Sequence, residues 1–322
     1  MTLAVTARDE ASTIAPCLSS LLAAVELAEH RAPVDFDVIV VLDRCRDATG
    51  AIASTFDRVR TLDSTGGLVE AQRQVAHLTE IVMFSDADIL VEPDTLLALL
   101  HAMERDPSLR VAYPPKTPLP PLRSTRLAHA LHVYNRRQGF QTRRHWFSGK
   151  LFAIRGWSIP TREQLADRLA RLPRDNFYDY HAGMRVDDIY LSRSILAEHG
   201  PDAIRCTDAG MLHFRPPETF EGMYRTYLRM RMEIERLDRM FPQTRAVHRR
   251  YGIRRHDPAA RRAAPAGERR AFWWFQAALL ACRLRYHLDR AYHRYWSPTP
   301  RDPWPPVHES KTDLWSDCDP PG

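Results

Sequence analysis

Residues 81–88 read Ile81-Val-Met-Phe84-Ser-Asp86-Ala-Asp88, an apolar run that ends in two aspartates. A short apolar run of this kind predicts a buried strand, here over Ile81–Phe84. Asp86 and Asp88 stand two positions apart, so in an extended chain their side chains point to the same side. In open parallel sheets, ligands bind beyond the carboxyl ends of the strands, which is where this pair falls. A single, isolated Asp-x-Asp also fits an ordinary turn. The neighbouring segments must therefore show whether this pair belongs to a functional site.

Short apolar runs alternate with helical patterns on both sides of this stretch. Further strands are predicted over Leu3–Thr6, Val38–Leu42, Val59–Leu62, Leu109–Tyr113 and Leu151–Ile154. Helical spacing and capping residues predict helices between them, for example over residues 95–104 after the cap Asp94. This alternation is typical of parallel strands with helices on both faces. We therefore expect an α/β fold with a mostly parallel sheet, and a proline-rich loop over Tyr113–Leu122.

Composition limits the class of protein. Of the 322 residues 44% are hydrophobic and 27% are charged, which is ordinary for a globular protein. The net charge of +6 is mild, and charge alone does not separate phosphate, nucleic-acid and anionic-lipid partners. Five scattered cysteines without a CxxC pair predict a reducing compartment. The sequence shows neither a signal-peptide pattern nor an apolar run near the roughly 20 residues of a membrane span, so we expect a cytoplasmic protein.

Two more predicted strands end in acidic residues. Glu10 follows the strand over Leu3–Thr6, and Asp43 and Asp47 follow the strand over Val38–Leu42. Because neighbouring parallel strands end at one edge, we expect these carboxylates to gather with Asp86. Carboxylates bind Mg²⁺ or Mn²⁺, but they repel a bare diphosphate, so such a site needs a cation and nearby arginines. The arginine candidates, each of which also fits a solvated surface, are Arg8, Arg44 and Arg73.

These segments resemble the family-two glycosyltransferases of the GT-A fold. The resemblance covers about the first hundred residues, in matching order and spacing, and rests on Thr6-Ala-Arg-Asp-Glu10, Val41-Leu-Asp43-Arg-Cys-Arg-Asp47, Gly66-Gly-Leu-Val-Glu-Ala71-Gln-Arg73 and Ser85-Asp86-Ala-Asp88. The last segment matches the Asp-x-Asp metal motif of that family. The glycines that usually follow the second-strand aspartate are replaced here by Arg44-Cys45, at the place where the family recognises the nucleotide base.

The resemblance implies a metal-dependent transferase that uses a UDP- or GDP-linked sugar together with Mn²⁺ or Mg²⁺. It implies that Glu10 and Asp43 contact the nucleoside. It also implies that Asp86 lies near the ribose and the metal, and that Asp88 is the main metal ligand. The full set of donor-binding candidates is Thr6, Arg8, Glu10, Asp43, Arg73, Asp86, Gly149, Arg229 and Arg231.

The second half of the chain adds an acidic pair. Met184-Arg-Val-Asp187-Asp188 resembles the family's two acidic residues at the start of a helix, of which the second commonly serves as the base. An inverting transfer needs a carboxylate to remove the proton of the acceptor hydroxyl, while the metal stabilises the departing diphosphate. We therefore expect Asp188 to be the catalytic base, with Asp187 beside it. The alternative is that both aspartates only cap the helix.

Three further positions complete the predicted site. Gly149, in His145-Trp-Phe-Ser-Gly149, resembles the small-residue turn that borders the donor sugar. His213 follows the acidic pair as a histidine ligand does in some GT-A enzymes, and is the third metal candidate after Asp86 and Asp88. Arg229 and Arg231 lie where relatives carry an arginine-containing helix near the diphosphate. For His213 and for these arginines, a purely structural or solvated role is the alternative.

We predict a GT-A catalytic domain over residues 1–235, with a nucleotide-sugar-binding half (1–113) and an acceptor half (114–235). Residues 236–322 are expected to form a basic helical extension with a tail rich in proline and tryptophan. Aromatic residues stand among the arginines of residues 272–294, which fits packing on the core or peripheral contact with the cytoplasmic face of an anionic membrane. The sequence does not name the acceptor, and a lipid-linked acceptor would suit membrane contact. We expect no nucleic-acid partner.

An inverting glycosyltransferase is the leading hypothesis among four. A retaining GT-A transferase also uses Asp-x-Asp with a later histidine. A nucleotidyltransferase would carry a glycine-rich loop after the first strand, and Ala7-Arg8-Asp9 lacks the glycines. A non-catalytic membrane- or nucleotide-binding relative would have no need of the intact acidic pairs.

Overall fold

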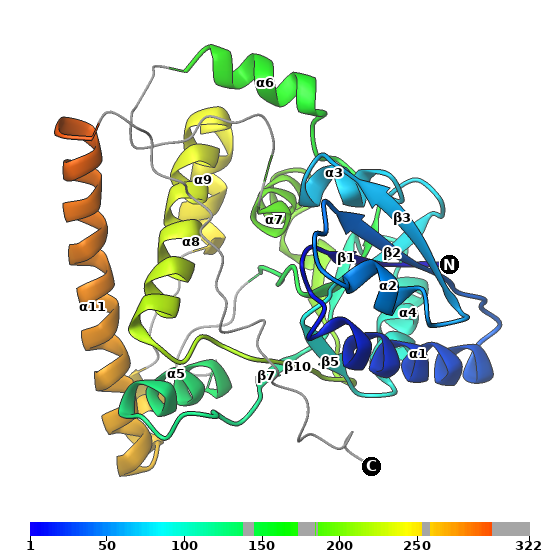
Figure 1. Ribbon diagram of the computed structural model, residues 1–322, viewed down its shortest axis with the longest axis horizontal. Coiled ribbons are helices and arrows are strands. Elements are labelled where there is room, and N and C mark those ends of the chain that lie inside the picture. Colours follow the sequence, from blue (N-terminus) through cyan, green and yellow to red (C-terminus); the bar gives the residue numbers. More distant parts are fainter. Residues whose placement is uncertain (138–144, 173–183, 185, 253–257, 298–322) are drawn as a thin grey trace.

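The computed structural model describes residues 1–137, 145–172, 184, 186–252 and 258–297, and it has the expected α/β architecture (Figure 1). The main sheet has seven strands in the order β3-β2-β1-β4-β8-β6-β9. Along the chain these strands are β1 (Thr2–Ala7), β2 (Asp37–Asp43), β3 (Val59–Ser64), β4 (Ile81–Asp86), β6 (Val111–Tyr113), β8 (Leu151–Arg155) and β9 (Ile204–Cys206).

Strands β1 to β4 are mutually parallel, as the sequence predicted. Thr6 of β1 lies between Val41 of β2 and Asp86 of β4, so these three strands end at one edge of the sheet. Strand β8 departs from the pattern because it runs antiparallel to both β4 and β6. Its first residue, Leu151, pairs with Ser85, so the turn before β8 reaches the same edge.

A second, three-stranded sheet extends this edge. It is formed by β5 (Ile89–Val91), β10 (Leu212–Phe214) and β7 (Lys116–Pro118), in the order β5-β10-β7. The predicted loop over Tyr113–Leu122 is therefore wrong for the three residues of β7. Pro118 is tolerated there because β7 is an edge strand, where a missing backbone N–H leaves no gap in the ladder.

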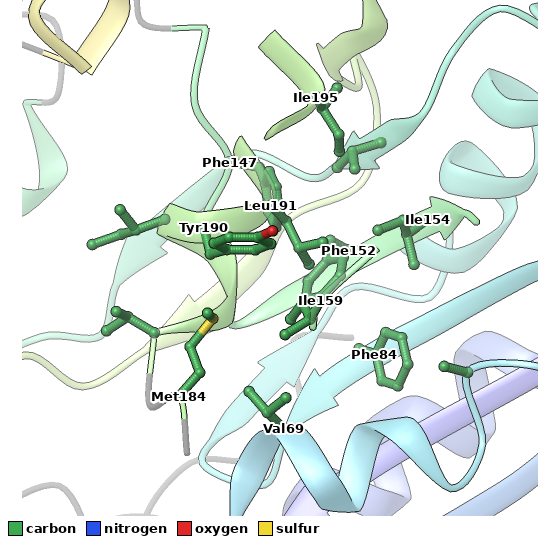
Figure 2. Close-up of a cluster of buried hydrophobic side chains, with 14 of the residues drawn as sticks. Val69, Phe84, Phe147, Phe152, Ile154, Ile159, Met184, Tyr190, Leu191 and Ile195 are labelled. Atoms are coloured by element: carbon green, nitrogen blue, oxygen red, sulfur yellow. The ribbon is translucent and has the colours of Figure 1, made fainter. Parts of the chain in front are cut away.

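Helices cover both faces of the main sheet. Helices α1 (Ile14–Arg31) and α4 (Thr95–Arg105) pack on one face, with α2 (Thr49–Ala53) beside α1. The other face is covered by α3 (Leu68–Arg73), α6 (Arg162–Ala170) and α7 (Asp187–Glu198). Figure 2 shows this second core, in which Phe84 of β4 and Phe152 of β8 lie with their ring centroids 5.5 Å apart, near Leu191 of α7.

A layer of three longer helices has its own core. Helix α11 (Ala266–Tyr295) packs against α5 (Arg126–Arg136) and α8 (Phe220–Met240), on the side of the molecule away from β3 (Figure 1). The remaining short helices are α9 (Arg245–Val247), α10 (Pro258–Ala263), the 3₁₀ turns Pro201–Ala203 and Pro242–Thr244, and the π turn His248–Gly252. The expected helical extension is confirmed for the part of residues 236–297 that is described. Since α8 runs through residue 235, the domain boundary placed there stays a prediction. Every helix in the described ranges is too short or too polar to cross a bilayer.

Candidate active site

Asp86 and Asp88 face the amine of Lys150. The Lys150 Nζ lies 2.8 Å from a carboxylate oxygen of Asp88 and 3.5 Å from one of Asp86. The backbone fixes this arrangement, because the N–H of Asp86 donates to the carbonyl of Lys150 over 2.8 Å where β8 begins beside the end of β4. The sequence hypothesis did not include Lys150. The only signal for it was its place directly after Gly149.

The charges of this cluster depend on one another. Burial raises the pKa of Asp86, and the nearby charge of Asp88 adds to the rise, while Lys150 opposes it. Burial by itself would lower the pKa of Lys150, but Asp88 and Asp86 together outweigh it and hold that pKa above its ordinary value. Lys150 is thus a charged ammonium ion seated between two carboxylates.

Helix α7 begins with the acidic pair, and its two carboxylates have different surroundings. Asp187 is 4% exposed and accepts a hydrogen bond from Gln72 Nε2 over 2.7 Å. Asp188 accepts from the N–H of Gly149 over 3.1 Å and from the N–H of Ile189 over 2.8 Å. Asp187 is therefore enclosed between α3 and α7, whereas Asp188 is held at the turn before β8.

Gly149 joins the two halves of the site. Its N–H holds Asp188, and the next residue, Lys150, holds Asp86 and Asp88. A Cβ atom at position 149 would lie 3.3 Å from the Cβ of Asp188 and 3.4 Å from its Cγ, a close contact that Asp188 could relieve only by a shift of a few tenths of an ångström. The structure thus brings the Asp-x-Asp motif and the predicted base together, as the sequence hypothesis required.

A second lysine lies at this turn. Lys116 Nζ is 3.1 Å from Ser148 Oγ, and it lies 5.4 Å from the ring centroid of Phe214, on the β10 strand next to β7. Lys150 Nζ is 5.7 Å from the same ring. Burial raises the pKa of Asp188, whereas the N–H groups that it accepts from and the charge of Lys116 lower it. The positive charges beside Asp86, Asp88 and Asp188 are therefore the ammonium groups of Lys150 and Lys116. The sequence had predicted arginines in this role.

The raised pKa of Asp187 predicts that the free energy of unfolding depends on pH. Burial raises its pKa to about 7, with the charge of Asp188 adding to the rise and Gln72 opposing it. The ordinary value is near 4, so between these pH values the folded chain binds more protons than the unfolded chain, and stability falls as pH rises. Asp187→Asn should therefore raise the free energy of unfolding at pH 8 by about 1–3 kcal/mol.

The same variant should change stability little near pH 4, where the wild-type carboxyl is protonated in the folded state and about half protonated in the unfolded state. The asparagine amide can donate to Gln72 Oε1, a buried acceptor without a partner among the described residues. Thermal unfolding followed by circular dichroism from pH 4 to pH 8 measures both effects. A lower melting temperature of the variant at pH 8 would contradict the assigned shift.

The predicted nucleoside contacts gather at the ends of β1 and β2. Asp43 is 5% exposed and accepts from the Gly67 N–H over 3.0 Å. It also accepts two hydrogen bonds of 3.1 Å from Arg44, while Arg8 Nη1 lies 3.9 Å away. Arg44 has a φ of 54°, a left-handed conformation that accompanies the return of its side chain onto Asp43. Asp43 thus lies between the guanidinium groups of Arg8 and Arg44.

Thr6, Glu10 and Arg73 lie around the same edge. Thr6 pairs in register with Asp86, and Glu10 accepts from Thr13 Oγ1 over 2.9 Å. Arg73 bonds to Glu70 and donates to the carbonyls of Ile159 and Pro160 over 3.1 and 2.7 Å, so it ties α3 to the segment before α6. A cavity of about 490 Å³ lies beside Arg73, and its lining is Ser64, Thr65, Gly66, Glu70, Arg73, Gln74 and Arg162.

His213, Arg229 and Arg231 have other neighbours. His213 Nε2 lies 3.4 Å from Glu92 Oε1, and the described residues contain no group of three or more His, Cys, Asp or Glu side chains that could hold a metal. The structure therefore does not bring His213 together with Asp86 and Asp88. Arg231 pairs with Glu235 over 2.8 Å on α8, the helix that also carries Arg229.

The Asp86 and Asp88 pair suits a hard divalent cation. Two carboxylates approach one point, and that point already attracts a positive charge, the amine of Lys150. Mg²⁺ and Mn²⁺ are often held by only one or two protein carboxylates together with phosphate oxygens. The absence of a third protein ligand among the described residues is therefore compatible with such an ion.

Comparison with known proteins identifies the family of the chain. A family model described as "Glycosyl transferase family 2" matches residues 2–169, just over half of the chain. No curated protein matches.

Among solved structures, the mannosyltransferase PcManGT from Pyrobaculum calidifontis, in complex with GDP-Man and Mn²⁺, is 17% identical, with 92% of this chain and 87% of that chain covered and a TM-score of 0.46. Glucosyl-3-phosphoglycerate synthase from Mycobacterium tuberculosis, with Mn²⁺, UDP-Glc and phosphoglyceric acid, is 16% identical, with 74% and 79% covered and a TM-score of 0.45. The family match, which contains the four segments quoted from the first half, shows that the chain belongs to glycosyl transferase family 2 and is a glycosyltransferase of the GT-A fold.

Proposed function

We propose that this enzyme moves a sugar from a nucleoside-diphosphate donor to an acceptor hydroxyl with inversion at the anomeric carbon. One observation supports this most strongly: the consecutive residues Gly149 and Lys150 join Asp188 to Asp86 and Asp88. A group that removes a proton and groups that offset the charge of a diphosphate are the two requirements of such a transfer. Here Asp188 and the Asp86 and Asp88 pair are all held by the same short turn, at Gly149 and Lys150.

Asp188 is suited to act as the base. Burial raises its pKa towards the working pH, which favours a carboxylate that accepts a proton during the reaction. The N–H groups of Gly149 and Ile189 orient it without using all of its lone pairs. In the proposed step, the acceptor O–H proton goes to Asp188 and the acceptor oxygen bonds to the anomeric carbon. The bond from that carbon to the diphosphate oxygen breaks, and the nucleoside diphosphate leaves with the electron pair.

Asp86 and Asp88 would hold Mn²⁺ or Mg²⁺. When bound, such an ion offsets the negative charge of the leaving diphosphate. The Lys150 amine occupies the carboxylates in the structure and carries the same sign of charge. We propose that Lys150 turns to the diphosphate when the donor arrives, with Lys116 as the second ammonium group of the turn. His213 remains a candidate ligand only if it leaves Glu92.

The nucleoside is expected at the ends of β1 and β2. Asp43 and Glu10 offer acceptors for the base and ribose, and Arg8 and Arg44 offer positive charge. Thr6 lies next to Asp86 in the sheet, between the nucleoside and metal positions. Arg73, Gly149, Arg229 and Arg231 remain proposed donor contacts, although Arg73 already has backbone partners. UDP and GDP are the two nucleotides that we propose.

A thermal-shift screen tests the donor and metal proposal. UDP or GDP with Mn²⁺ should stabilise the wild type by about 2.7 kcal/mol when the nucleotide is at a hundred times its Kd. Asp88→Ala should abolish the part that depends on Mn²⁺. Asp94→Ala is the matched control, because Asp94 stands at the start of α4 without a side-chain capping bond. If no nucleotide shifts the wild-type melting temperature with Mn²⁺ or without it, the proposal is wrong.

The retaining and non-catalytic alternatives have their own test. The anomeric configuration of the first product, read by NMR, is opposite to that of the donor for an inverting enzyme and the same for a retaining one. A protein that binds nucleotides but never releases one from a nucleotide sugar would favour the non-catalytic alternative.

We also propose a cytoplasmic site of action. Cys17, Cys45, Cys206 and Cys282, which are the cysteines within the described ranges, are all free thiols, as is usual in a reducing compartment. A lipid-linked acceptor and peripheral contact with the cytoplasmic face of a membrane remain part of this proposal, and a nucleic-acid partner does not.

A further inference from the structure

Large exposed hydrophobic side chains gather on one helix. Of the eleven such residues in the described part of the chain, eight lie on α11 or directly after it. They are 49–71% exposed, and they are Trp273, Trp274, Leu280, Leu284, Leu288, Tyr292, Tyr295 and Trp296. Single exposed apolar residues are ordinary on a protein surface, whereas a contiguous group marks a site of protein or membrane contact.

Their spacing places them on one side of α11. Trp273, Leu280, Leu284, Leu288 and Tyr295 follow each other by seven, four, four and seven residues, which are helical repeats of a single face. Trp274 and Tyr292 border that face. We call these seven residues the α11 stripe. At 1.5 Å per residue the stripe runs for about 33 Å.

The opposite side of α11 holds the helix on the protein. Phe275 stacks on Tyr134 of α5, with ring centroids 3.5 Å apart, and Cys282 and Tyr286 are fully buried. Arg285 bonds to Glu221 of α8 over 2.6 Å. Packing on α5 and α8 therefore accounts for one face of α11, and it leaves the α11 stripe exposed.

The charges along α11 are sorted by face. The exposed charged residues of the helix are all basic, namely Arg269, Arg270, Arg283 and Arg294. The two acidic residues face the protein: Glu268 pairs with Arg136 and Arg137 of α5, and Asp289 accepts a hydrogen bond from Tyr224 of α8. The exposed side of α11 is thus both apolar and positively charged.

We propose that the α11 stripe docks this enzyme on an anionic lipid bilayer, with the helix lying in the plane of the interface. A helix with an apolar face bordered by arginines binds such a surface through buried apolar area together with attraction to anionic headgroups. Trp and Tyr suit the interface because each ring has an apolar body and a polar atom. Five of the eight large exposed hydrophobic residues on or directly after α11 are Trp or Tyr.

The same charges disfavour a second copy of the chain as the occupant. In a symmetric dimer, the same patch faces itself. Arg283 and Arg294 would then meet only positive charge from the other α11, since the acidic residues of the helix are turned inward. Anionic headgroups complement the patch, whereas another α11 repels it.

Sedimentation of the full chain with vesicles tests the proposal. We expect binding to phosphatidylcholine vesicles in which one lipid in three is phosphatidylglycerol, and binding at least tenfold weaker to phosphatidylcholine alone. The double variant Leu284→Ser/Leu288→Ser should weaken binding to the anionic vesicles at least tenfold. Arg283→Glu/Arg294→Glu should remove the preference for anionic lipid. Leu78→Ser is the matched control, because Leu78 is 50% exposed but lies outside α11.

Two results would overturn the proposal. One is equal vesicle binding by the wild type and by Leu284→Ser/Leu288→Ser. The other is a lipid-free dimer, seen by analytical ultracentrifugation, that this double variant dissociates. Melting temperatures confirm that the variants fold, which is expected because both leucines are more than half exposed. Nucleotide binding, measured in parallel, separates a failure of the docking proposal from a failure of the proposed transferase function.

Discussion

Asp188→Asn is expected to lower kcat by about a thousandfold and to change donor binding little. The asparagine side chain has the shape of aspartate, and its one oxygen can keep one of the two hydrogen bonds from the N–H groups of Gly149 and Ile189. It cannot take the proton of the acceptor hydroxyl, so the loss falls on the chemical step. Release of the nucleoside diphosphate, measured at saturating donor and acceptor, gives kcat, and titration calorimetry with the nucleotide and Mn²⁺ gives donor affinity.

The matched control for this variant is Asp94→Asn, which changes an aspartate at the start of α4 that makes no side-chain cap. We expect its kcat to equal that of the wild type. A kcat for Asp188→Asn within tenfold of the wild type would mean that another group removes the proton, and Asp188 would then be a structural residue at the start of α7.

Lys150→Met is expected to have opposite effects on metal binding and on turnover. In the donor-free protein the amine of Lys150, at 2.8 Å from Asp88, competes with a divalent ion for the two carboxylates. Removing it should strengthen Mn²⁺ binding at least tenfold, because the amine no longer competes with the ion for Asp86 and Asp88. With the donor bound, the variant lacks the amine that we propose to contact the leaving diphosphate, so kcat should fall by about a hundredfold.

Calorimetric titration with Mn²⁺ in the absence of nucleotide measures the first effect, and steady-state turnover measures the second. Lys150→Arg keeps the positive charge and should leave the Mn²⁺ affinity within a few-fold of the wild type. A merely structural Lys150 would not raise the metal affinity on removal. Unchanged or weaker Mn²⁺ binding by Lys150→Met would therefore contradict the role that we assign to it.

The part of the site that could be predicted from the sequence is the part that local patterns determine. Strands β1, β2 and β4 are apolar runs followed by acidic residues, and parallel neighbours must end at one edge, so Glu10, Asp43 and Asp86 were expected together. The acidic pair at the start of α7 stands before a helical pattern and was found by resemblance. The family match over residues 2–169 contains the four segments of the first half that carried the resemblance.

Lys150 could not be predicted in the same way. Its place beside Asp86 depends on the antiparallel register of β8 with β4, a tertiary pairing that no local pattern shows. The three-residue strands β5, β7 and β10 are too short for a period of two to be read. The arginines illustrate the opposite difficulty. The positive charge of Arg73 predicts a contact with the diphosphate. In the structure its guanidinium donates instead to the carbonyls of Ile159 and Pro160, which are remote in the sequence.

The bridge made by Gly149 and Lys150 limits how this enzyme can vary. Gly149 and Lys150 are consecutive, with Cα atoms about 3.8 Å apart, so the N–H that holds Asp188 and the side chain that contacts Asp86 and Asp88 start from adjacent points of the backbone. An insertion between these two residues would separate the two contacts, and a Cβ atom at position 149 would require Asp188 to shift by a few tenths of an ångström. We therefore expect differences in the bound sugar or acceptor to be accommodated by the surrounding loops and helices, with this turn unchanged.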